Sequence, residues 1–286
     1  MSATRPGGAI LNAEQIKEFR TNGFVAIKGF YDIDRDVIPV QEGVYKVIGQ
    51  VMKRHGVQDS RSAFSPETFD EGYNAMIATD RGYGGEVYDA VKQIPAFMRL
   101  VALAIHEQVF RDLRPTSIPG LAAGGYGIRI DNPHEERFRA PWHQEYPAQL
   151  RSVDGVTFWS PLVPMSPELG PVEFCAGSQR EGLVPVYERD LANPGKSGAY
   201  ALRLKDEENL VAKYQKVAPL AEPGDLLIID FLVLHASGRN TATRSRWSMQ
   251  FRYFNFNEPT GMRYGWKGSF AAGVDFRTIH PDLWVG

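Results

Sequence analysis

Apolar residues recur at helical spacing in three segments of the first 115 residues, and this spacing predicts helices over 12–23, 40–56 and 95–113. Asn12 can cap the first of them, with a glutamine three positions later completing a capping box and a glycine at the end. Residues 58–86 lack the periodicity and are rich in glycine, which predicts a loop.

The pattern changes at about residue 121. From there to about residue 256, short runs of β-branched and aromatic residues alternate with Gly, Pro and Asn turns, as is typical of strands. The expected strands are 123–130, 138–146, 155–163, 171–175, 182–187, 213–219, 225–231 and 246–256. Eight strands without intervening helices predict a mainly β fold, a double-stranded β-helix (jelly roll) core, which the N-terminal α-helices support on one outer face.

The whole chain, residues 1–286, is expected to form a single domain. Helical support covers about 11–115, the jelly-roll core about 121–256, and an aromatic C-terminal tail 257–286. The tail is too aromatic to be free, so we expect it to pack on the core or to form a subunit contact. A further segment, residues 188–212, interrupts the strands and is either a lid or a solvated surface loop.

Composition narrows the class of protein. Hydrophobic residues at 43% and charged residues at 23% are ordinary for a globular protein, and a formal net charge of −2 gives no reason to expect nucleic acid or an anionic membrane as partner. No apolar run approaches the roughly 18 residues that span a bilayer, and the first residues do not resemble a signal peptide. The single cysteine, Cys175, excludes an internal disulfide. We therefore expect a cytoplasmic protein without nucleic acid or membrane as partner. We also expect a monomer or homodimer.

His143 and Glu145 are the first candidate metal ligands. In a strand, side chains two positions apart share a face, with Cα atoms roughly 6.6 Å apart, so both can reach one metal ion. His235 would complete a two-histidine, one-carboxylate set, the arrangement of non-haem Fe(II) oxygenases. By itself His-x-Glu also fits a strand with one buried histidine and one solvated glutamate, so the context of His235 has to decide.

That context supports a metal site. A Pro-Gly-Asp turn at 223–225 begins an apolar run of strand length, His235 follows, and Arg246 lies eleven positions later (246 − 235). Even positions from 244 to 252 are polar and odd positions from 247 to 253 are apolar or aromatic, so one face of this strand can line a polar cavity. A guanidinium there suits a dicarboxylate, because it binds a carboxylate through two parallel hydrogen bonds. The alternation alone does not choose between Arg244 and Arg246.

These motifs resemble those of the phytanoyl-CoA dioxygenase family of Fe(II)/2-oxoglutarate oxygenases. Their order and spacing are similar to the family's from about residue 11 to about residue 256, which is most of the chain. The matching segments are the opening at 11–30, Trp142-His143-Gln144-Glu145, Phe158-Trp159, Pro223-Gly224-Asp225, His235-Ala236-Ser237 and Arg246.

The resemblance implies Fe(II) as the metal, 2-oxoglutarate as cosubstrate and O2 as oxidant, with iron held by His143, Glu145 and His235. It favours Arg246 over Arg244 as the partner of the distal carboxylate of 2-oxoglutarate. It also implies a cosubstrate pocket lined by Ser237, Gln144 and Trp159.

The implied reaction is oxidation of a C–H bond of a small molecule, by hydroxylation, desaturation or cyclisation, with release of succinate and CO2. A secondary-metabolite intermediate or an amino-acid-like compound is favoured over an acyl-CoA as substrate. Six residues are available to contact a polar or anionic substrate, or are ordinary surface residues: Arg81, Tyr83, Tyr88, His134, Arg137 and Arg139.

Two positions depart from the family pattern. Glu145 stands where the family usually has Asp, which leaves its mode of coordination open. A carboxylate of either length argues against halogenation, because the related halogenases lack one there to make room for chloride. Gln179 stands where the family often has His, which concerns the edge of the pocket and not the metal.

Two other classes of protein compete with the oxygenase. A cupin-type enzyme that uses Zn or Mn without 2-oxoglutarate has no need of a buried guanidinium facing the metal. A non-catalytic small-molecule-binding barrel would be expected to have lost at least one metal ligand, whereas all three candidates are present here.

Overall fold

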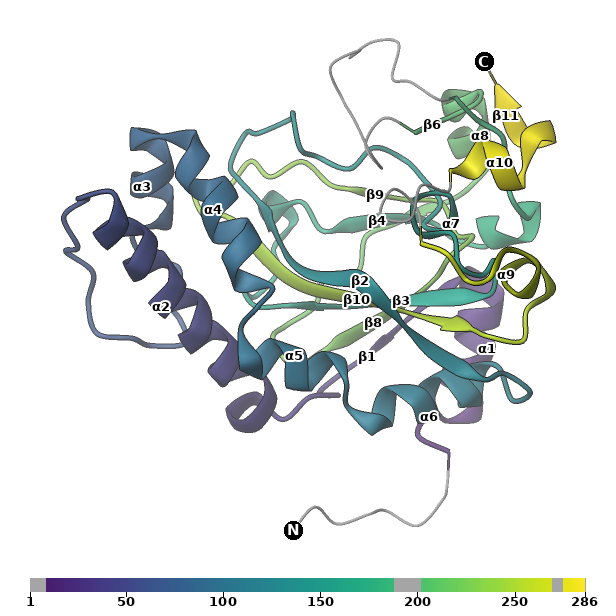
Figure 1. Cartoon of the computed structure of the whole chain (residues 1–286), viewed down its shortest axis with the longest axis horizontal. Coiled ribbons are helices and arrows are strands. Elements are labelled where there is room, and N and C mark those ends of the chain that lie inside the picture. The colour runs from purple at the N-terminus through teal and green to yellow at the C-terminus, as the bar shows by residue number, and fades with distance from the viewer. Residues whose placement is uncertain (1–8, 188–201, 269–274, 286) are drawn as a thin grey trace.

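The computed structural model describes residues 9–187, 202–268 and 275–285 (Figure 1). Its larger sheet has five antiparallel strands in the order β1-β8-β3-β10-β2. They are β1 (Phe24–Ile27), β2 (Pro119–Asp131), β3 (Gly155–Pro161), β8 (Leu226–Asp230) and β10 (Arg246–Asn255). The long central strand β10 carries side chains to both faces of this sheet, and those faces have different neighbours.

A smaller antiparallel sheet, β7-β4-β9, faces the inner side of the larger one across a cavity. Its strands are β4 (Val172–Cys175), β7 (Lys216–Val217) and β9 (His235–Ser237). A third sheet, β11-β5-β6, consists of β5 (Val186–Tyr187), β6 (Arg203–Leu204) and β11 (Trp284–Val285). The two facing sheets form the jelly-roll core that the hydrophobic pattern predicts.

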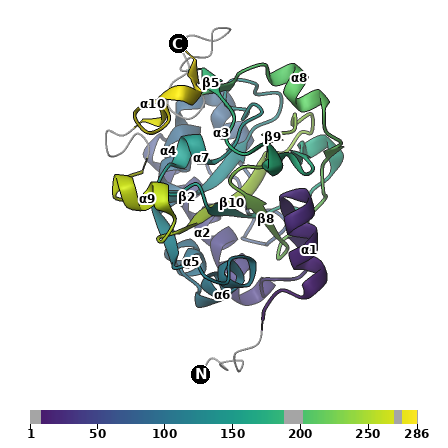
Figure 2. The ribbon, with the colours of Figure 1, turned by 90° about the vertical axis from the view of Figure 1, so that its right-hand side faces the viewer.

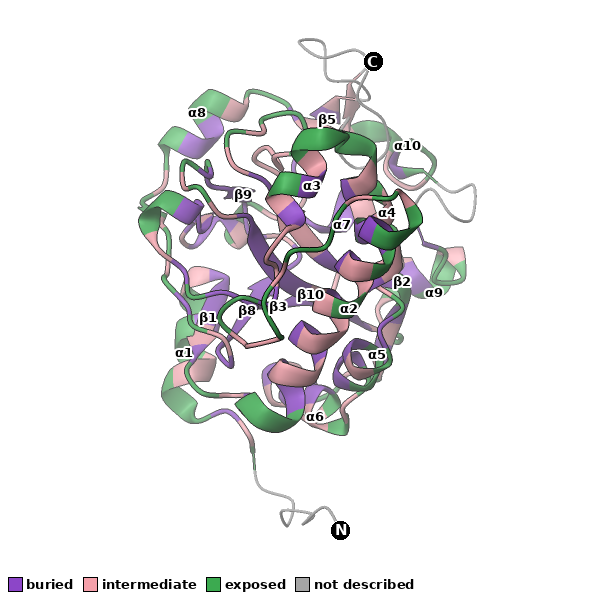
Figure 3. Ribbon diagram, turned by 90° about the vertical axis from the view of Figure 1, so that its left-hand side faces the viewer, coloured by how far each residue is buried: buried purple, intermediate pink, exposed green. Residues whose placement is uncertain are grey.

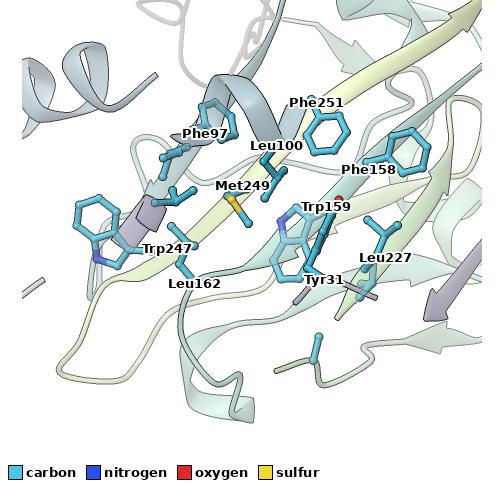
Figure 4. Packing of buried hydrophobic residues seen from close by; sticks show 14 of the residues in the cluster. Tyr31, Phe97, Leu100, Phe158, Trp159, Leu162, Leu227, Trp247, Met249 and Phe251 are labelled. Carbon is cyan, nitrogen blue, oxygen red and sulfur yellow. The ribbon is translucent and has the colours of Figure 1, made fainter. Parts of the chain in front are cut away.

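Helices cover the outer face of the larger sheet (Figures 1 and 3). The N-terminal ones are α1 (Ala13–Asn22), the π-helical turn η1 (Ile33–Val37), α2 (Ile38–Arg54), α3 (Tyr73–Thr79), α4 (Arg81–Val91), α5 (Pro95–Val101) and α6 (Ala104–Leu113). Figure 4 shows Phe97 and Leu100 of α5 packed on Met249 and Phe251, the odd-numbered side chains of β10. The apolar face of β10 therefore points to the helices and its polar face to the cavity.

The predicted capping box of the first helix is present. The Asn12 side chain accepts from the backbone N–H of Gln15, the Gln15 side chain accepts from that of Asn12, and Gly23 ends α1 in the left-handed conformation. The predicted loop at 58–86 is wrong, because this stretch contains α3 and the start of α4. A Cβ added at Gly84 would lie 2.9 Å from Tyr73 Oη, which is too close. Glycine is therefore needed here for the close packing of α3 and α4, and its presence is not the sign of a loop.

The helix expected over 95–113 is two helices, α5 and α6. Leu103 is extended (φ −63°, ψ 129°), and the apolar spacing continues across the break, so periodicity could not reveal it. The strand expected over 138–146 is also wrong. Pro141 lacks an N–H for pairing, and Glu145 is helical (φ −68°, ψ −37°) at the start of the short helix α7 (Tyr146–Gln149).

The remaining helical turns lie around the sheets: η2 (Pro167–Leu169), η3 (Ser178–Glu181), α8 (Glu207–Ala212), α9 (Pro259–Tyr264), α10 (Phe276–Ile279) and η5 (Pro281–Leu283). The described part of the tail packs on the core, where α10 lies near α7 and β5 (Figure 2). β11 pairs with β5, and His280 Nε2 lies 2.9 Å from Tyr146 Oη. Most of the segment considered as a lid, 188–201, lies outside the described residues. None of the helices in the described ranges has the length and hydropathy to cross a bilayer.

One titratable group lies deep in the core. His106 of α6 is fully buried, its Nε2 lies 2.9 Å from Tyr31 Oη, and its ring packs against Phe158 and Phe251. Burial lowers the pKa of His106 to about 4, so the imidazole is neutral in the folded protein. It is a packed core residue.

Below pH 6.5 the unfolded chain binds a proton at His106 that the folded chain does not bind until about pH 4. The free energy of unfolding should therefore fall as the pH decreases from 6.5 to 4, by on the order of 3 kcal/mol from this group. His106→Gln should show a shallower fall. Urea unfolding at successive pH values measures both slopes, and equal slopes would contradict the assignment.

Candidate metal centre

The side chains of His143, Glu145 and His235 converge on one point. Their ligand atoms all lie within 4.8 Å of one another, and within the described residues they are the one group of this kind. Nε2 of His235 lies 3.8 Å from Oε2 of Glu145, and the two imidazole centroids are 4.2 Å apart. The structure thus brings together the two histidines and the carboxylate that the sequence suggested.

Backbone pairing places the two histidines side by side. The N–H of His143 donates to the carbonyl of His235 at 3.0 Å, and the N–H of His235 donates to the carbonyl of His143 at 3.1 Å. Residues paired in this way lie directly opposite each other, with neighbouring side chains. Glu145 arrives separately, its N–H donating to the carbonyl of Phe231 at 2.9 Å. The three ligands therefore converge without the regular strand that was expected.

Both imidazoles are oriented by backbone carbonyls. Nδ1 of His143 lies 2.7 Å from the carbonyl of Pro141, and Nδ1 of His235 lies 3.0 Å from that of Val233. A carbonyl oxygen only accepts, so each Nδ1 carries the proton and each Nε2 keeps its lone pair. This is the usual outer-shell support of a metal-binding histidine.

The protonation states also suit a cation. Burial lowers the pKa of both imidazoles, to about 3 for His235, so both are neutral near pH 7. Burial alone would raise the pKa of the Glu145 carboxyl, but the neighbouring Arg252 guanidinium, and after it the two imidazoles, outweigh burial and lower the pKa to about 2. Two neutral nitrogen donors and one carboxylate are the ligand set that binds Fe(II) in non-haem oxygenases.

A cavity of about 260 Å³ lies beside these ligands, between the two facing sheets. Polar and charged side chains line it alongside the candidate ligands: Arg129, Thr157, Ser237, Arg246, Gln250 and Arg252. Trp159, Val172 and Ile229 add apolar surface. The cavity can hold a small molecule, and the groups that line it can orient a polar ligand.

Arg246 is the most deeply buried of these cations, at 1% exposed. Its Nη2 donates to Oδ2 of Asp131 at 2.7 Å and to Oγ of Ser237 at 2.9 Å. Its Nη1 donates to the carbonyl of Gly170, and its Nε has no partner among the described residues. Arg244 precedes β10 and lies outside the cavity, with its guanidinium on Asp70. Of the two arginines that the alternation left open, only Arg246 lines the cavity.

Of the three residues expected in the cosubstrate pocket, Ser237 and Trp159 line the cavity, whereas Gln144 does not. The Gln144 amide donates to the carbonyls of Gly182 and Leu232 at 2.7 Å each and accepts from the N–H of Val184 at 3.0 Å. The structure therefore places the Gln144 side chain outside this cavity, with all of these bonds made to backbone groups. Its side chain links its own segment of the chain to two others, residues 182–184 and Leu232.

Three residues at the site had no role in the sequence-based expectations: Arg252, Thr157 and Asp131. Arg252 donates from Nε to Oε1 of Glu145 at 3.1 Å, and Thr157 Oγ1 is buried with no partner among the described residues. The Asp131 carboxylate bonds both Arg129 and Arg246, whose charges outweigh its burial and lower its pKa to about 2. The alternation of polar and apolar residues on β10 already placed Arg252 on the polar face. The positions of Thr157 and Asp131 depend on which strands pair with β10, which the sequence pattern does not show.

Residues 19–248 match the protein family described as phytanoyl-CoA dioxygenase (PhyH). The chain belongs to the phytanoyl-CoA dioxygenase family. It is accordingly an Fe(II)/2-oxoglutarate-dependent oxygenase, as its motifs predicted, with Fe(II), 2-oxoglutarate and O2 as its cofactor and cosubstrates. The cupin-type and non-catalytic alternatives are set aside with this result.

Solved structures of similar fold agree with family membership. EctD from S. alaskensis, in a structure with 2-oxoglutarate and 5-hydroxyectoine, has a TM-score of 0.57 at 15% identity, covering 89% of this chain and 80% of its own. The carbocyclase SnoK of nogalamycin biosynthesis has a TM-score of 0.53 at 15% identity, covering 87% of each chain. At such identities the likeness shows a shared fold. No curated protein matches the sequence of this family member.

If Gln144 is structural, Gln144→Leu should lower the free energy of unfolding by about 2 kcal/mol, because it leaves buried backbone groups without partners. The affinity of the folded protein for 2-oxoglutarate should stay within about twofold. Urea unfolding and anaerobic titration with 2-oxoglutarate measure the two quantities, with Gln93→Leu on the surface as control. Loss of 2-oxoglutarate binding in a stable Gln144 variant would restore the original assignment.

Proposed function

We propose that this oxygenase binds Fe(II) through His143, Glu145 and His235 and oxidises a C–H bond of a small molecule while converting 2-oxoglutarate to succinate and CO2. The observation that carries the proposal is the convergence of two Nε2 lone pairs and a carboxylate beside a polar cavity. Both Nδ1 protons are held by carbonyls, so neither imidazole has to rearrange to coordinate a metal.

Fe(II) together with 2-oxoglutarate supplies the activation of O2 that a C–H oxidation requires, and the chain's own residues do the rest. The paired backbones of His143 and His235 hold the two imidazoles in place. Glu145 contributes one carboxylate, and Arg252 bonds its Oε1 while Oε2 faces His235. This division supports coordination through a single oxygen of the glutamate.

Arg246 is the proposed partner of the distal carboxylate of 2-oxoglutarate. It is buried and positively charged, it lines the cavity, and its Nε lacks a partner among the described residues. Ser237, two positions after His235, bonds the same guanidinium, so the cosubstrate end of the cavity lies on the His235 side of the metal centre. Trp159 offers a flat apolar wall beside it.

The substrate is proposed to be a secondary-metabolite intermediate or an amino-acid-like compound, and the reaction a hydroxylation, desaturation or cyclisation. The small cavity supports a compact substrate over an acyl-CoA. Proteins of similar fold carry out varied reactions of this kind: SnoK is described as a carbocyclase, SnoN as an epimerase, and EctD is seen with 5-hydroxyectoine. We propose a monomer or homodimer, without nucleic acid or membrane as partner.

His143→Ala and His235→Ala should each abolish Fe(II) binding and turnover, because two remaining ligands do not form the facial set. Anaerobic titration with Fe(II) and then 2-oxoglutarate should give the visible iron-to-keto-acid charge-transfer band in the wild type and not in these variants. His134→Ala, at an exposed histidine, is the control and should keep the band. Full activity in either ligand variant would remove the metal assignment.

Arg246→Gln should raise the 2-oxoglutarate concentration needed for half-maximal charge-transfer absorbance by roughly 10- to 100-fold while Fe(II) stays bound, because charge-assisted hydrogen bonds contribute about 1.5–3 kcal/mol. The glutamine amide can still donate a hydrogen bond to Asp131, so the variant is expected to fold. Arg244→Gln is the matched control outside the cavity and should bind 2-oxoglutarate as the wild type does. The reverse result would transfer the role to Arg244.

A further inference from the structure

The cavity has a second buried guanidinium that cosubstrate binding does not explain. Arg252 is 8% exposed and lines the cavity six positions beyond Arg246 on the same face of β10, roughly 20 Å along the strand. Arg246 contacts Ser237 on the His235 side of the metal centre, whereas Arg252 contacts Glu145 on the other side. A five-carbon dicarboxylate bound at Arg246 therefore leaves Arg252 to a different ligand.

The partners of Arg252 do not satisfy its charge once a metal is bound. Its Nε donates to Glu145 at 3.1 Å, its Nη1 makes a long bond of 3.4 Å to the carbonyl of Gly125, and its Nη2 has no partner among the described residues. Glu145 is the one carboxylate that lines the cavity within the described part of the chain, and a metal would draw on its charge. A buried guanidinium that shares its one counter-charge with a metal ion is only partly compensated, which is costly.

Unpartnered polar groups lie next to Arg252. Thr157 is its direct neighbour on β3, 2% exposed, and its Oγ1 has no hydrogen-bond partner among the described residues. The side chain of Gln250, two positions along the same face, also makes no hydrogen bond within them, and it lines the cavity. Opposite Gln250 on β2 is Gly127, where an added Cβ would meet nothing within 4 Å, so there is open space above these donors.

A second arginine adds to the positive charge. Arg151 forms no ion pair within the described residues; it donates to the carbonyls of Gln149 and Ala123. Burial first, and then the charge of Arg252, lower its pKa, as expected where two guanidinium groups lie near each other. Nearby cations of this kind attract an anionic ligand.

We propose that Arg252, with Thr157 and Gln250, binds a carboxylate of the substrate on the Glu145 side of the metal centre, so that the substrate is a small organic acid. This inference rests on the proposed function and specifies its substrate class. Guanidinium, hydroxyl and side-chain amide donors aimed into one buried space match the several lone pairs of a carboxylate. An acid bound at Arg252 lies beside the proposed metal ligands, at the other end of the cavity from 2-oxoglutarate bound at Arg246.

The test uses trifluoroacetate as the acid probe and 2,2,2-trifluoroethanol as the uncharged probe of similar size. Each is added anaerobically to protein loaded with Fe(II) and saturating 2-oxoglutarate, and 19F relaxation is measured; Zn(II)-loaded protein gives the diamagnetic baseline. With the Fe(II)-loaded wild type, the 19F relaxation rate of trifluoroacetate should rise above the Zn(II) baseline in a saturable way. The relaxation rate of trifluoroethanol should stay nearly at the baseline. Saturating 2-oxoglutarate keeps the probe from Arg246.

Arg252→Gln should weaken trifluoroacetate binding at least tenfold, measured on protein whose charge-transfer band shows that Fe(II) and 2-oxoglutarate are bound. Thr157→Val, which keeps the side-chain shape and does not touch Glu145, should weaken it roughly two- to tenfold, the effect of one hydrogen bond. Arg244→Gln, outside the cavity, is the matched control and should bind the probe as the wild type does.

Each outcome decides a separate question. If the wild type forms no charge-transfer band, the proposed function itself fails. If the band forms but trifluoroacetate does not relax faster than trifluoroethanol, or Thr157→Val and Arg252→Gln leave its binding unchanged, the substrate-acid site is overturned and the oxygenase assignment stands. If Arg252→Gln loses the band, Arg252 positions Glu145 or binds the cosubstrate, and its role as substrate anchor is rejected.

Discussion

The structure depends on one doubly hydrogen-bonded contact, the pair of N–H to carbonyl bonds between His143 and His235. The two residues are 92 positions apart in sequence (235 − 143), and only this pairing sets their imidazoles 4.2 Å apart, centre to centre. Backbone carbonyls then orient both rings from behind. Because the ring orientation comes from backbone bonds, the site is prepared for a cation by the fold itself.

Charge balance organises the rest of the cavity. Buried guanidinium groups are costly unless they are paired, and here each lies against a carboxylate: Arg246 and Arg129 on Asp131, and Arg252 on Glu145. The first arrangement does not involve the proposed metal ligands, whereas the second includes one of them, Glu145. The two ends of the cavity are therefore different electrostatically, which supports separate places for cosubstrate and substrate.

The strand β10 links core packing to this chemistry. Its odd-numbered side chains, such as Met249 and Phe251, pack under the helices, and its even-numbered ones line the cavity. A shift of the strand by one residue would bury the arginines in the apolar layer, so the packing of the helices holds the register that the site needs. Gln144 acts similarly on the other side by tying three backbone segments together.

The sequence by itself determined the fold class, the family, the candidate ligands and the polar face of β10, because alternation and short spaced motifs are properties of local sequence. It misplaced the helices within 58–86 and the supposed strand at 138–146. Only the tertiary structure decided that Asp131 meets Arg246, that Thr157 lies beside Arg252, and that Glu145 reaches the metal centre from a helical turn. The reason is physical: these contacts join segments distant in sequence, and strand pairing and packing, rather than any local preference, bring them together.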